Sequence, residues 1–128
     1  MEINTFDIVR VDFGDANFAG EQGGVRPAVV IQNYYGNLYS DTTIVIPFTT
    51  KIKHIHQPTH SFFYKDEEGK GLTKDSMLLG ECVRQVSKQR ILQKLGVITK
   101  IQEKKKVKAV YDANFGILEE EWSVWKNM

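Results

Sequence analysis

Arg26 is the residue of this sequence whose type and surroundings most directly predict chemistry. A guanidinium stays protonated near neutral pH, and its planar fork of donors fits two oxygens of one phosphate group. Gly23 and Gly24 precede it and would allow the backbone to approach such a group closely. The pattern predicts a phosphodiester site, and an ion pair with Glu21 or Asp41 is the alternative explanation for the same arginine.

Two other side chains with chemical potential carry less information by themselves. The adjacent hydroxyls of Thr49 and Thr50 follow the apolar run 43–48, where β-branched residues are common for structural reasons alone. Cys82 has apolar neighbours and no base nearby in the sequence. Since a reactive thiolate needs a lowered pKa, we expect Cys82 to be an unreactive packed thiol.

Three histidines lie in the segment 54-HIHQPTH-60. No cysteine or carboxylate within it completes a metal shell, and Pro58 excludes a helical pair of ligands, so we expect no metal and no other cofactor. A histidine pair acting as general acid and base, as in some ribonucleases, is one alternative, and a solvated loop is another. His60 is the best candidate of the three.

Composition bounds the class of protein. A chain of 128 residues with 41% hydrophobic and 26% charged residues predicts one globular domain, residues 1–128. No apolar run reaches the roughly 20 residues of a membrane-spanning helix, and a single cysteine excludes an internal disulfide. We therefore expect a cytoplasmic protein without a membrane partner.

Charge limits how nucleic acid could be bound. The net charge of +1 excludes the broad attraction of a strongly basic nucleic-acid binder and leaves room for a local site. The basic run 103-EKKKVK-108 is the most obvious cluster, and we expect it to be the solvated face of a helix, with contact to nucleic acid or an acidic partner as the alternative.

Hydrophobic periodicity predicts about five strands followed by helices. The expected strands are 6–13, 28–31, 43–48, 61–65 and 76–86, the last with a bulge at Gly80. The segments 14–24 and 33–41 are expected to be a loop and a turn. This order favours an α+β, mainly β, antiparallel domain that forms a small barrel.

Two helices are expected after the strands. Ser87 suits an N-cap, Ile91, Leu92 and Leu95 would share a face, and Gly96 would end a short helix. Thr99 and Gln102 resemble a capping box that opens a longer helix, with Val107, Val110, Tyr111 and Asn114 at helical spacing.

Several blocks together resemble the MazF/PemK family of toxin endoribonucleases. They are, in order, 7-DIVRVDF-13, 21-EQGGVRPAVVIQN-33, 45-VIPFTT-50, 58-PTH-60 and 75-DSMLLGECVR-84. The resemblance covers about residues 6–116 and leaves 117–128 as an additional tail. It implies a small SH3-like antiparallel β-barrel with C-terminal helices, a homodimer, and a cognate antitoxin protein. The implied activity is sequence-specific cleavage of single-stranded RNA without a metal in the bacterial cytoplasm.

The resemblance also implies roles for particular residues. Arg26 and Thr49 occupy the central catalytic positions, Glu81 matches a position implicated in some members, and Glu21 or Glu81 would accept a proton. Residues expected to contact RNA are Phe18, Gly20, Gln22, Gly24, Thr50, His60, Cys82 and Arg84. Gly20 and Cys82 replace the serine and glutamine usual in the family, which puts the RNA sequence preference in question. Phe18, Tyr34, Tyr35 and Tyr39 offer surfaces for stacking bases, or for core or dimer packing.

The hypothesis that follows is attack of the RNA 2′-hydroxyl on its adjacent phosphate, with Arg26 stabilising the charge on phosphorus. Two other functions stay open. A binding protein of the same fold is the first, since relatives of the gyrase-poisoning toxin CcdB share the barrel and act on a protein. A ribonuclease that depends on His56 and His60 is the second.

Overall fold

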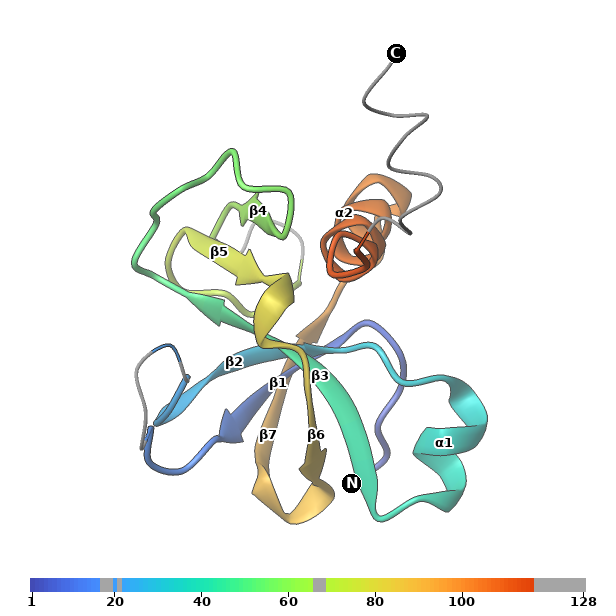
Figure 1. The fold of residues 1–128 in the computed structure, drawn as a ribbon. Coiled ribbons are helices and arrows are strands. Elements are labelled where there is room, and N and C mark those ends of the chain that lie inside the picture. The colour runs from blue at the N-terminus through green and yellow to red at the C-terminus, as the bar shows by residue number, and fades with distance from the viewer. Residues whose placement is uncertain (17–19, 21, 66–68, 117–128) are drawn as a thin grey trace.

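A computed structural model describes residues 1–16, 20, 22–65 and 69–116, and this part of the chain folds into a curled antiparallel sheet with two α-helices (Figure 1). The strands are β1 (Asp7–Asp12), β2 (Val25–Val30), β3 (Thr42–Thr49), β4 (His60–Phe63), β5 (Ser76–Leu79), β6 (Arg84–Ser87) and β7 (Ile91–Val97). The helices are α1 (Tyr34–Tyr39) and α2 (Ile101–Asp112), and two short 3₁₀ helices are η1 (Gly80–Cys82) and η2 (Lys88–Arg90). Across these residues no helix has the length and apolarity that a bilayer crossing requires.

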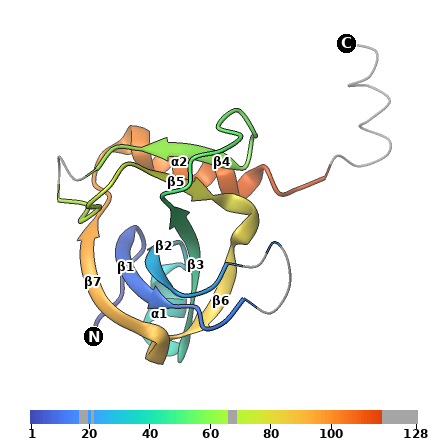
Figure 2. The same cartoon turned by 90° about the vertical axis from the view of Figure 1, so that its left-hand side faces the viewer.

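The strands follow the order β4-β5-β3-β2-β1-β7, and β6 pairs with the first half of β3. This arrangement confirms the expected antiparallel, mainly β, α+β fold. The ladder does not close into a complete barrel, because β4 and β7 end the hydrogen-bonded order among the described residues. The strands nevertheless curl around a common centre (Figure 2). The backbone nitrogen of Val97 donates to the carbonyl of Gly69 at 3.1 Å, which ties the segment before β5 to β7.

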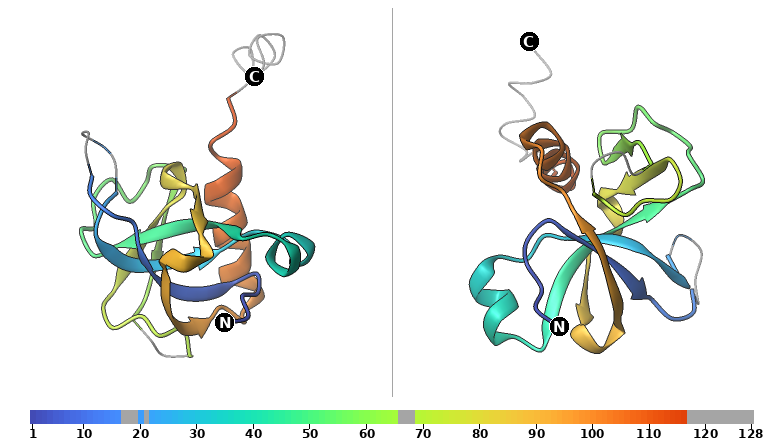
Figure 3. Two further views of the ribbon diagram at one scale, coloured as in Figure 1. Left: turned by 90° about the horizontal axis from the view of Figure 1, so that it is seen from below. Right: turned by 180° about the vertical axis from the view of Figure 1, so that it is seen from behind.

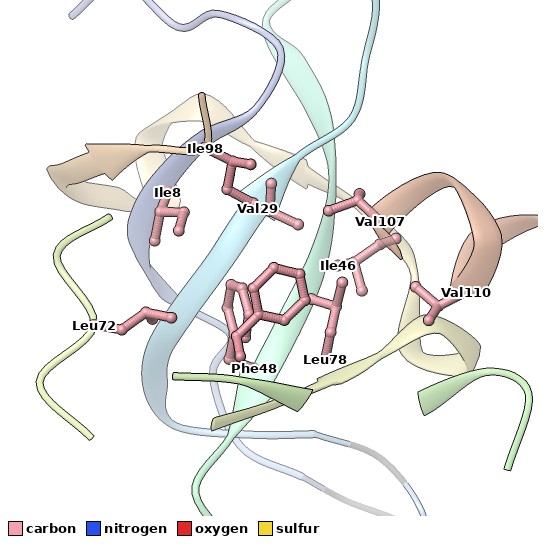
Figure 4. Packing of buried hydrophobic residues seen from close by; sticks show 10 residues of the cluster. Ile8, Val29, Ile46, Phe48, Leu72, Leu78, Ile98, Val107 and Val110 are labelled. Carbon is pink, nitrogen blue, oxygen red and sulfur yellow. The ribbon is translucent and has the colours of Figure 1, made fainter. Parts of the chain in front are cut away.

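Both faces of the central strands are buried. Ile8, Val29 and Ile46 belong to one apolar cluster, which Val107 and Val110 of α2 cover (Figure 4). Their neighbours in sequence, such as Val9, Val30 and Val45, belong to a second cluster. Side chains alternate between the faces of a strand, so a continuous apolar run is what a strand buried on both sides requires.

The turn expected at 33–41 is instead the short helix α1. The side chain of Asn33 caps it by accepting from the backbone nitrogen of Gly36 at 2.8 Å. Asn37 is the buried residue of this helix. Its Oδ1 accepts from the hydroxyl of Thr43 at 2.8 Å, and its Nδ2 donates to the carbonyl of Gln32 at 2.8 Å. These side-chain bonds stabilise a helix too short to persist alone.

The prediction of a single long strand at 76–86 was wrong for the middle of that segment. The segment is broken into β5 and β6 by η1, which begins at Gly80. A Cβ at Gly80 would lie 2.3 Å from the carbonyl oxygen of Val110, so only glycine allows α2 to pack this closely. The break is also where β3 exchanges β5 for β6 as its partner.

The short helix expected after Ser87 was also wrong for most of its length. Ser87 does act as an N-cap, and its side chain accepts from the backbone nitrogen of Gln89, but the helix is only the three residues of η2. Residues 91–97 instead form β7, which pairs with β1. Leu92 is 47% exposed, so the apolar triad that suggested a helix has no common buried face.

The longer C-terminal helix is confirmed, but its start differs in detail. Lys100 is the N-cap, without a side-chain capping bond, so the capping box of Thr99 and Gln102 is not formed. Val107 and Val110 are buried as expected. Asn114 lies just beyond the helix and donates from Nδ2 to the carbonyl of Gly80 at 2.9 Å.

Replacing Gly80 with alanine should destabilise the protein, because the new methyl group would meet the backbone of Val110 and Thr59. We expect Gly80→Ala to lower the free energy of unfolding by about 1–3 kcal/mol, the usual cost of overpacking, as measured by urea denaturation. Gly116→Ala is the matched control, since a Cβ there meets nothing within 4 Å. Equal stability of both variants would show that the contact between η1 and α2 does not constrain this position.

Candidate active site

A cavity of about 1160 Å³ opens where β2 begins and β3 ends. Loop segments before β2 and before β5 complete its walls, together with η1. Of the residues predicted from the sequence, it is lined by Gly20, Gln22, Gly24, Arg26, Thr49, Thr50, His60, Glu81 and Cys82. The structure therefore brings together most of a set that is scattered over 60 positions of the sequence.

Strand register explains why Arg26 and Thr49 meet. β2 and β3 pair through Ala28↔Pro47 and the two following pairs, and the same register extended by two residues places Arg26 opposite Thr49. Both residues lie at even spacing from members of the second apolar cluster, Ala28 on β2 and Val45 on β3. Since side chains alternate along a strand, Arg26 and Thr49 face the same side of the sheet.

The guanidinium of Arg26 is held by its own loop. Its Nε donates to the carbonyl of Gly23 at 3.2 Å, and its Nη1 donates to Oε1 of Gln22. In the described part of the chain no carboxylate lies within ion-pair distance of Arg26. The alternative ion pair with Asp41 is not formed, because Asp41 lies at the far end of β3. Arg26 thus lines the cavity with its charge not neutralised by a carboxylate of the described residues.

Thr49 also keeps its hydroxyl proton available. Its Oγ1 accepts a hydrogen bond from the backbone nitrogen of Lys51 at 3.2 Å. An oxygen that accepts through a lone pair can still donate its proton to another acceptor. The hydroxyl can therefore donate to an anion in the cavity opposite Arg26.

Glu81 and His60 form a close pair on the same cavity. Nε2 of His60 lies 2.7 Å from Oε2 of Glu81, and Nδ1 lies 3.0 Å from the carbonyl oxygen of His54. Gln57 donates to the same Glu81 oxygen at 3.3 Å. The His60 side chain is 6% exposed and that of Glu81 39% exposed, so the carboxylate is the member of the pair that a ligand can reach.

Cys82 lies within electrostatic range of both Arg26 and Glu81. Burial raises the pKa of its thiol, the charge of Glu81 raises it further, and the charge of Arg26 lowers it. The net direction is upward, so Cys82 is a neutral thiol near pH 7 and matches the expected unreactive side chain. It adds a weakly polar surface to the cavity that the two charged groups also line.

Other predicted residues lie elsewhere. Arg84 does not line the cavity, and its guanidinium is stacked 5.3 Å from the centre of the Phe13 ring. Tyr34, Tyr35 and Tyr39 are exposed on α1, across the molecule from the β1–β2 connection (Figure 3), so they cannot stack bases bound beside Arg26. Glu21 and Phe18 lie outside the described residues.

Sequence reasoning missed three lysines that line the cavity, Lys51, Lys53 and Lys74. The signal available was the K-I-K spacing that directly follows Thr49 and Thr50. His54 and His56 do not line the cavity. The described residues contain no group of three or more histidine, cysteine, aspartate or glutamate side chains placed to hold a metal ion.

The pKa of Cys82 should report the two flanking charges. We expect Glu81→Gln to lower this pKa, because it removes a negative charge that disfavours the thiolate, and Arg26→Ala to raise it for the opposite reason. The measurement is the pH dependence of iodoacetamide alkylation, which is unambiguous because the chain has one cysteine. Asp112→Asn on α2 is the control with no expected effect, and shifts of the same sign in both test variants would contradict the geometry.

Comparison with known proteins identifies relatives of this chain. At 42% identity over 89 residues, the chain is similar to Endoribonuclease EndoA of Bacillus subtilis (strain 168), with 64% of this chain and 75% of EndoA covered. It is 39% identical over 97 residues to Endoribonuclease MazF of Staphylococcus saprophyticus, with 76% and 78% covered.

Solved structures resemble this chain at lower sequence identity, and they support only its fold. MazF (Form-I) from Deinococcus radiodurans superposes with a TM-score of 0.69 at 18% identity, covering 88% of this chain and 93% of that one. A mycobacterial endoribonuclease in complex with its cognate antitoxin gives a TM-score of 0.64 at 16% identity, covering 84% and 89%. The model of the PemK-like, MazF-like toxin of type II toxin–antitoxin systems matches residues 4–111, and the chain therefore belongs to that family.

Proposed function

We propose that this protein is the endoribonuclease toxin of a toxin–antitoxin pair, and that it cuts single-stranded mRNA at short sequence motifs in the bacterial cytoplasm. The observation that carries the proposal is that Arg26 and Thr49, from neighbouring strands, line one cavity. The names of the two curated relatives, both endoribonucleases, support the same activity.

The proposed chemistry uses a nucleophile that belongs to the substrate. The RNA 2′-hydroxyl attacks its adjacent phosphorus, the bond to O5′ breaks, and the products carry a 2′,3′-cyclic phosphate and a 5′-hydroxyl. The protein then has to orient the phosphate and stabilise its additional charge, and neither task requires a metal. Arg26 supplies a fixed cation, and the Thr49 hydroxyl supplies a second donor to the phosphate oxygens.

Glu81 is the proposed acceptor of the 2′-hydroxyl proton. Its carboxylate reaches the cavity, while His60 and Gln57 bind one of its oxygens and fix its orientation. Both ring nitrogens of His60 lie at hydrogen-bond distance from oxygen atoms, which holds the ring in place against Glu81. Glu21 remains the alternative acceptor, because its place in the sequence also adjoins the Arg26 loop.

We further propose that the protein is a homodimer inhibited by a cognate antitoxin. One of the solved relatives is described as a complex with its cognate antitoxin. An acidic segment lying over the cavity would place carboxylates where Arg26 otherwise meets phosphate. Inhibition would then follow from occupancy of the RNA site. The alternative of a CcdB-like binding protein gives no reason for Arg26 and Thr49 to face one cavity.

Incubation of the purified protein with long single-stranded RNA in EDTA tests the activity directly. We expect cleavage at a short motif with 5′-hydroxyl ends, read by sequencing the 5′ ends of the fragments. Arg26→Ala should lower the rate by about 10²–10³-fold, the usual loss for a donor to a developing oxyanion. Arg26→Lys should be almost as slow, because a point charge cannot replace the fork.

Arg10→Ala is the control for this experiment, since Arg10 is exposed on β1 and does not line the cavity. RNA that stays intact under every condition would eliminate the nuclease. Cleavage by Arg26→Ala at the wild-type rate would eliminate the assigned role of Arg26.

The roles of Glu81 and His60 can be separated by single-turnover rates. Glu81→Gln should slow cleavage by about 10²–10⁴-fold, as loss of a general base does. His60→Ala should cost less, because His60 acts through Glu81, and His56→Ala should cost nothing. A His60→Ala variant that is slower than Glu81→Gln would favour the histidine-dependent mechanism instead.

A further inference from the structure

The wall of the cavity beyond Thr49 carries three cations that the catalytic proposal does not use. Lys51 and Lys53 belong to the connection from β3 to β4, and Lys74 belongs to the segment before β5. All three are exposed. Within the described ranges, no carboxylate lies at ion-pair distance from any of their ammonium groups. We call these three residues the lysine rim.

Strand register places the lysine rim on the opposite side of Thr49 from Arg26. β3 lies between β2 and β5 at this end of the sheet (Figure 1). Thr49 pairs with Met77 of β5 on this flank of β3. Lys51 and Lys53 follow Thr49 along the chain, and Lys74 precedes β5, so both segments leave the same end of this strand pair. Arg26 belongs to β2, on the other flank of β3. The lysine rim therefore faces a neighbouring part of the ligand and not the group that Arg26 and Thr49 hold between them.

Charge on the cavity wall is strongly one-sided. The ionisable side chains that line it include the cations Arg26 and the lysine rim, against the acids Asp15 and Glu81. One of these acids, Glu81, is already bound by His60. For a chain whose net charge is only +1, this is a local concentration of positive charge. Such a wall fits a ligand with several phosphates in series.

We propose that the lysine rim binds the backbone phosphates next to the scissile one and so fixes the direction in which single-stranded RNA crosses the cavity. This inference rests on the proposed nuclease function. Lysine is a flexible point charge, which suits phosphates of a mobile strand better than it suits base edges. The lysine rim thus contributes affinity and salt dependence, and the choice of cut motif comes from other residues.

The basic run of α2 provides a contrast with the same charge. None of its lysines lines the cavity. Lys104 lies 5.1 Å from the centre of the Phe6 ring, and Lys108 pairs with Asp112 at 2.6 Å on the surface of the helix. The most obvious cluster in the sequence is therefore not the one that faces the site, and it supplies a control of equal charge.

Binding measured against salt concentration tests the proposal. The probe is a short RNA that spans the cut motif and carries 2′-deoxyribose at the cut position, so that it binds but has no nucleophile. The association constant falls as the salt concentration rises, and each phosphate contact with a single strand adds roughly 0.7 to the steepness of log K against log salt. Replacing Lys51, Lys53 and Lys74 together with alanine should therefore make this dependence less steep by about 2. The control replaces Lys104, Lys105 and Lys108 with alanine and should leave the slope unchanged.

A second measurement locates the phosphates. Neutral methylphosphonate linkages are placed one at a time on either side of the cut position. Wild-type protein should bind more weakly to RNA whose methylphosphonate lies on one side of the cut position, and equally well when it lies on the other side. The lysine-rim variant should bind the modified and the unmodified RNA with equal affinity.

The possible outcomes distinguish failure of the lysine-rim proposal from failure of the proposed nuclease function. Wild-type protein that neither binds nor cuts RNA would overturn the nuclease function. Wild-type protein that does both, with an unchanged slope in the lysine-rim variant or an equal change in the α2 control, would overturn the lysine rim alone. Loss of affinity at methylphosphonates on both sides in wild type and variant alike would do the same.

Discussion

β3 exchanges hydrogen-bonded neighbours along its length, and the cavity lies where this exchange happens. Its first half pairs with β6, its middle with β2, and its last residues with β5. Where β2 has not yet joined the ladder, its first residues are free of cross-strand bonds to β3, and Arg26 projects from that stretch. Strand pairing a few residues away thus supplies a rigid frame, while Arg26 and Thr49 are only half-buried.

That frame reduces the entropy that the site must lose when it binds a ligand. A guanidinium with rotamer freedom would have to be ordered during each encounter, at a cost of roughly 2 kcal/mol for a long side chain. The bonds from Arg26 to Gly23 and Gln22 order it in advance. The glycine contributes here in a specific way, since a Cβ at Gly23 would lie 2.7 Å from the backbone nitrogen of Ala16 and would force the loop apart.

The sequence predicts those elements whose structure is decided by neighbouring residues, and it fails for those decided by pairing with distant parts of the chain. The strands β1, β2 and β3 are predicted by apolar runs that need burial on two faces. Arg26, Thr49 and Glu81 were selected because they match the sequence blocks of the family. β7 was not predictable from local pattern, because the residues that it pairs with in β1 lie 80 to 90 positions away in the sequence. The lysine rim was missed for the same reason, since the pairing of β3 with β5 brings the segments of Lys51 and Lys74 to one cavity.

An arginine and a glutamate on one cavity raise a physical problem, because a direct pair between them would neutralise the charge that each contributes. The structure avoids this by giving each a neutral or separate partner: Gln22 and a carbonyl hold Arg26, while His60 and Gln57 hold Glu81. Cys82, neutral because its pKa is raised, lines the same cavity and lies within electrostatic range of both charges. A hydrogen-bonding side chain at that position would offer both groups an alternative partner, whereas a thiol offers each very little. The replacement of the usual glutamine by Cys82 therefore preserves the separation of charge on which the proposed mechanism depends, while it removes an amide that could otherwise contact a base.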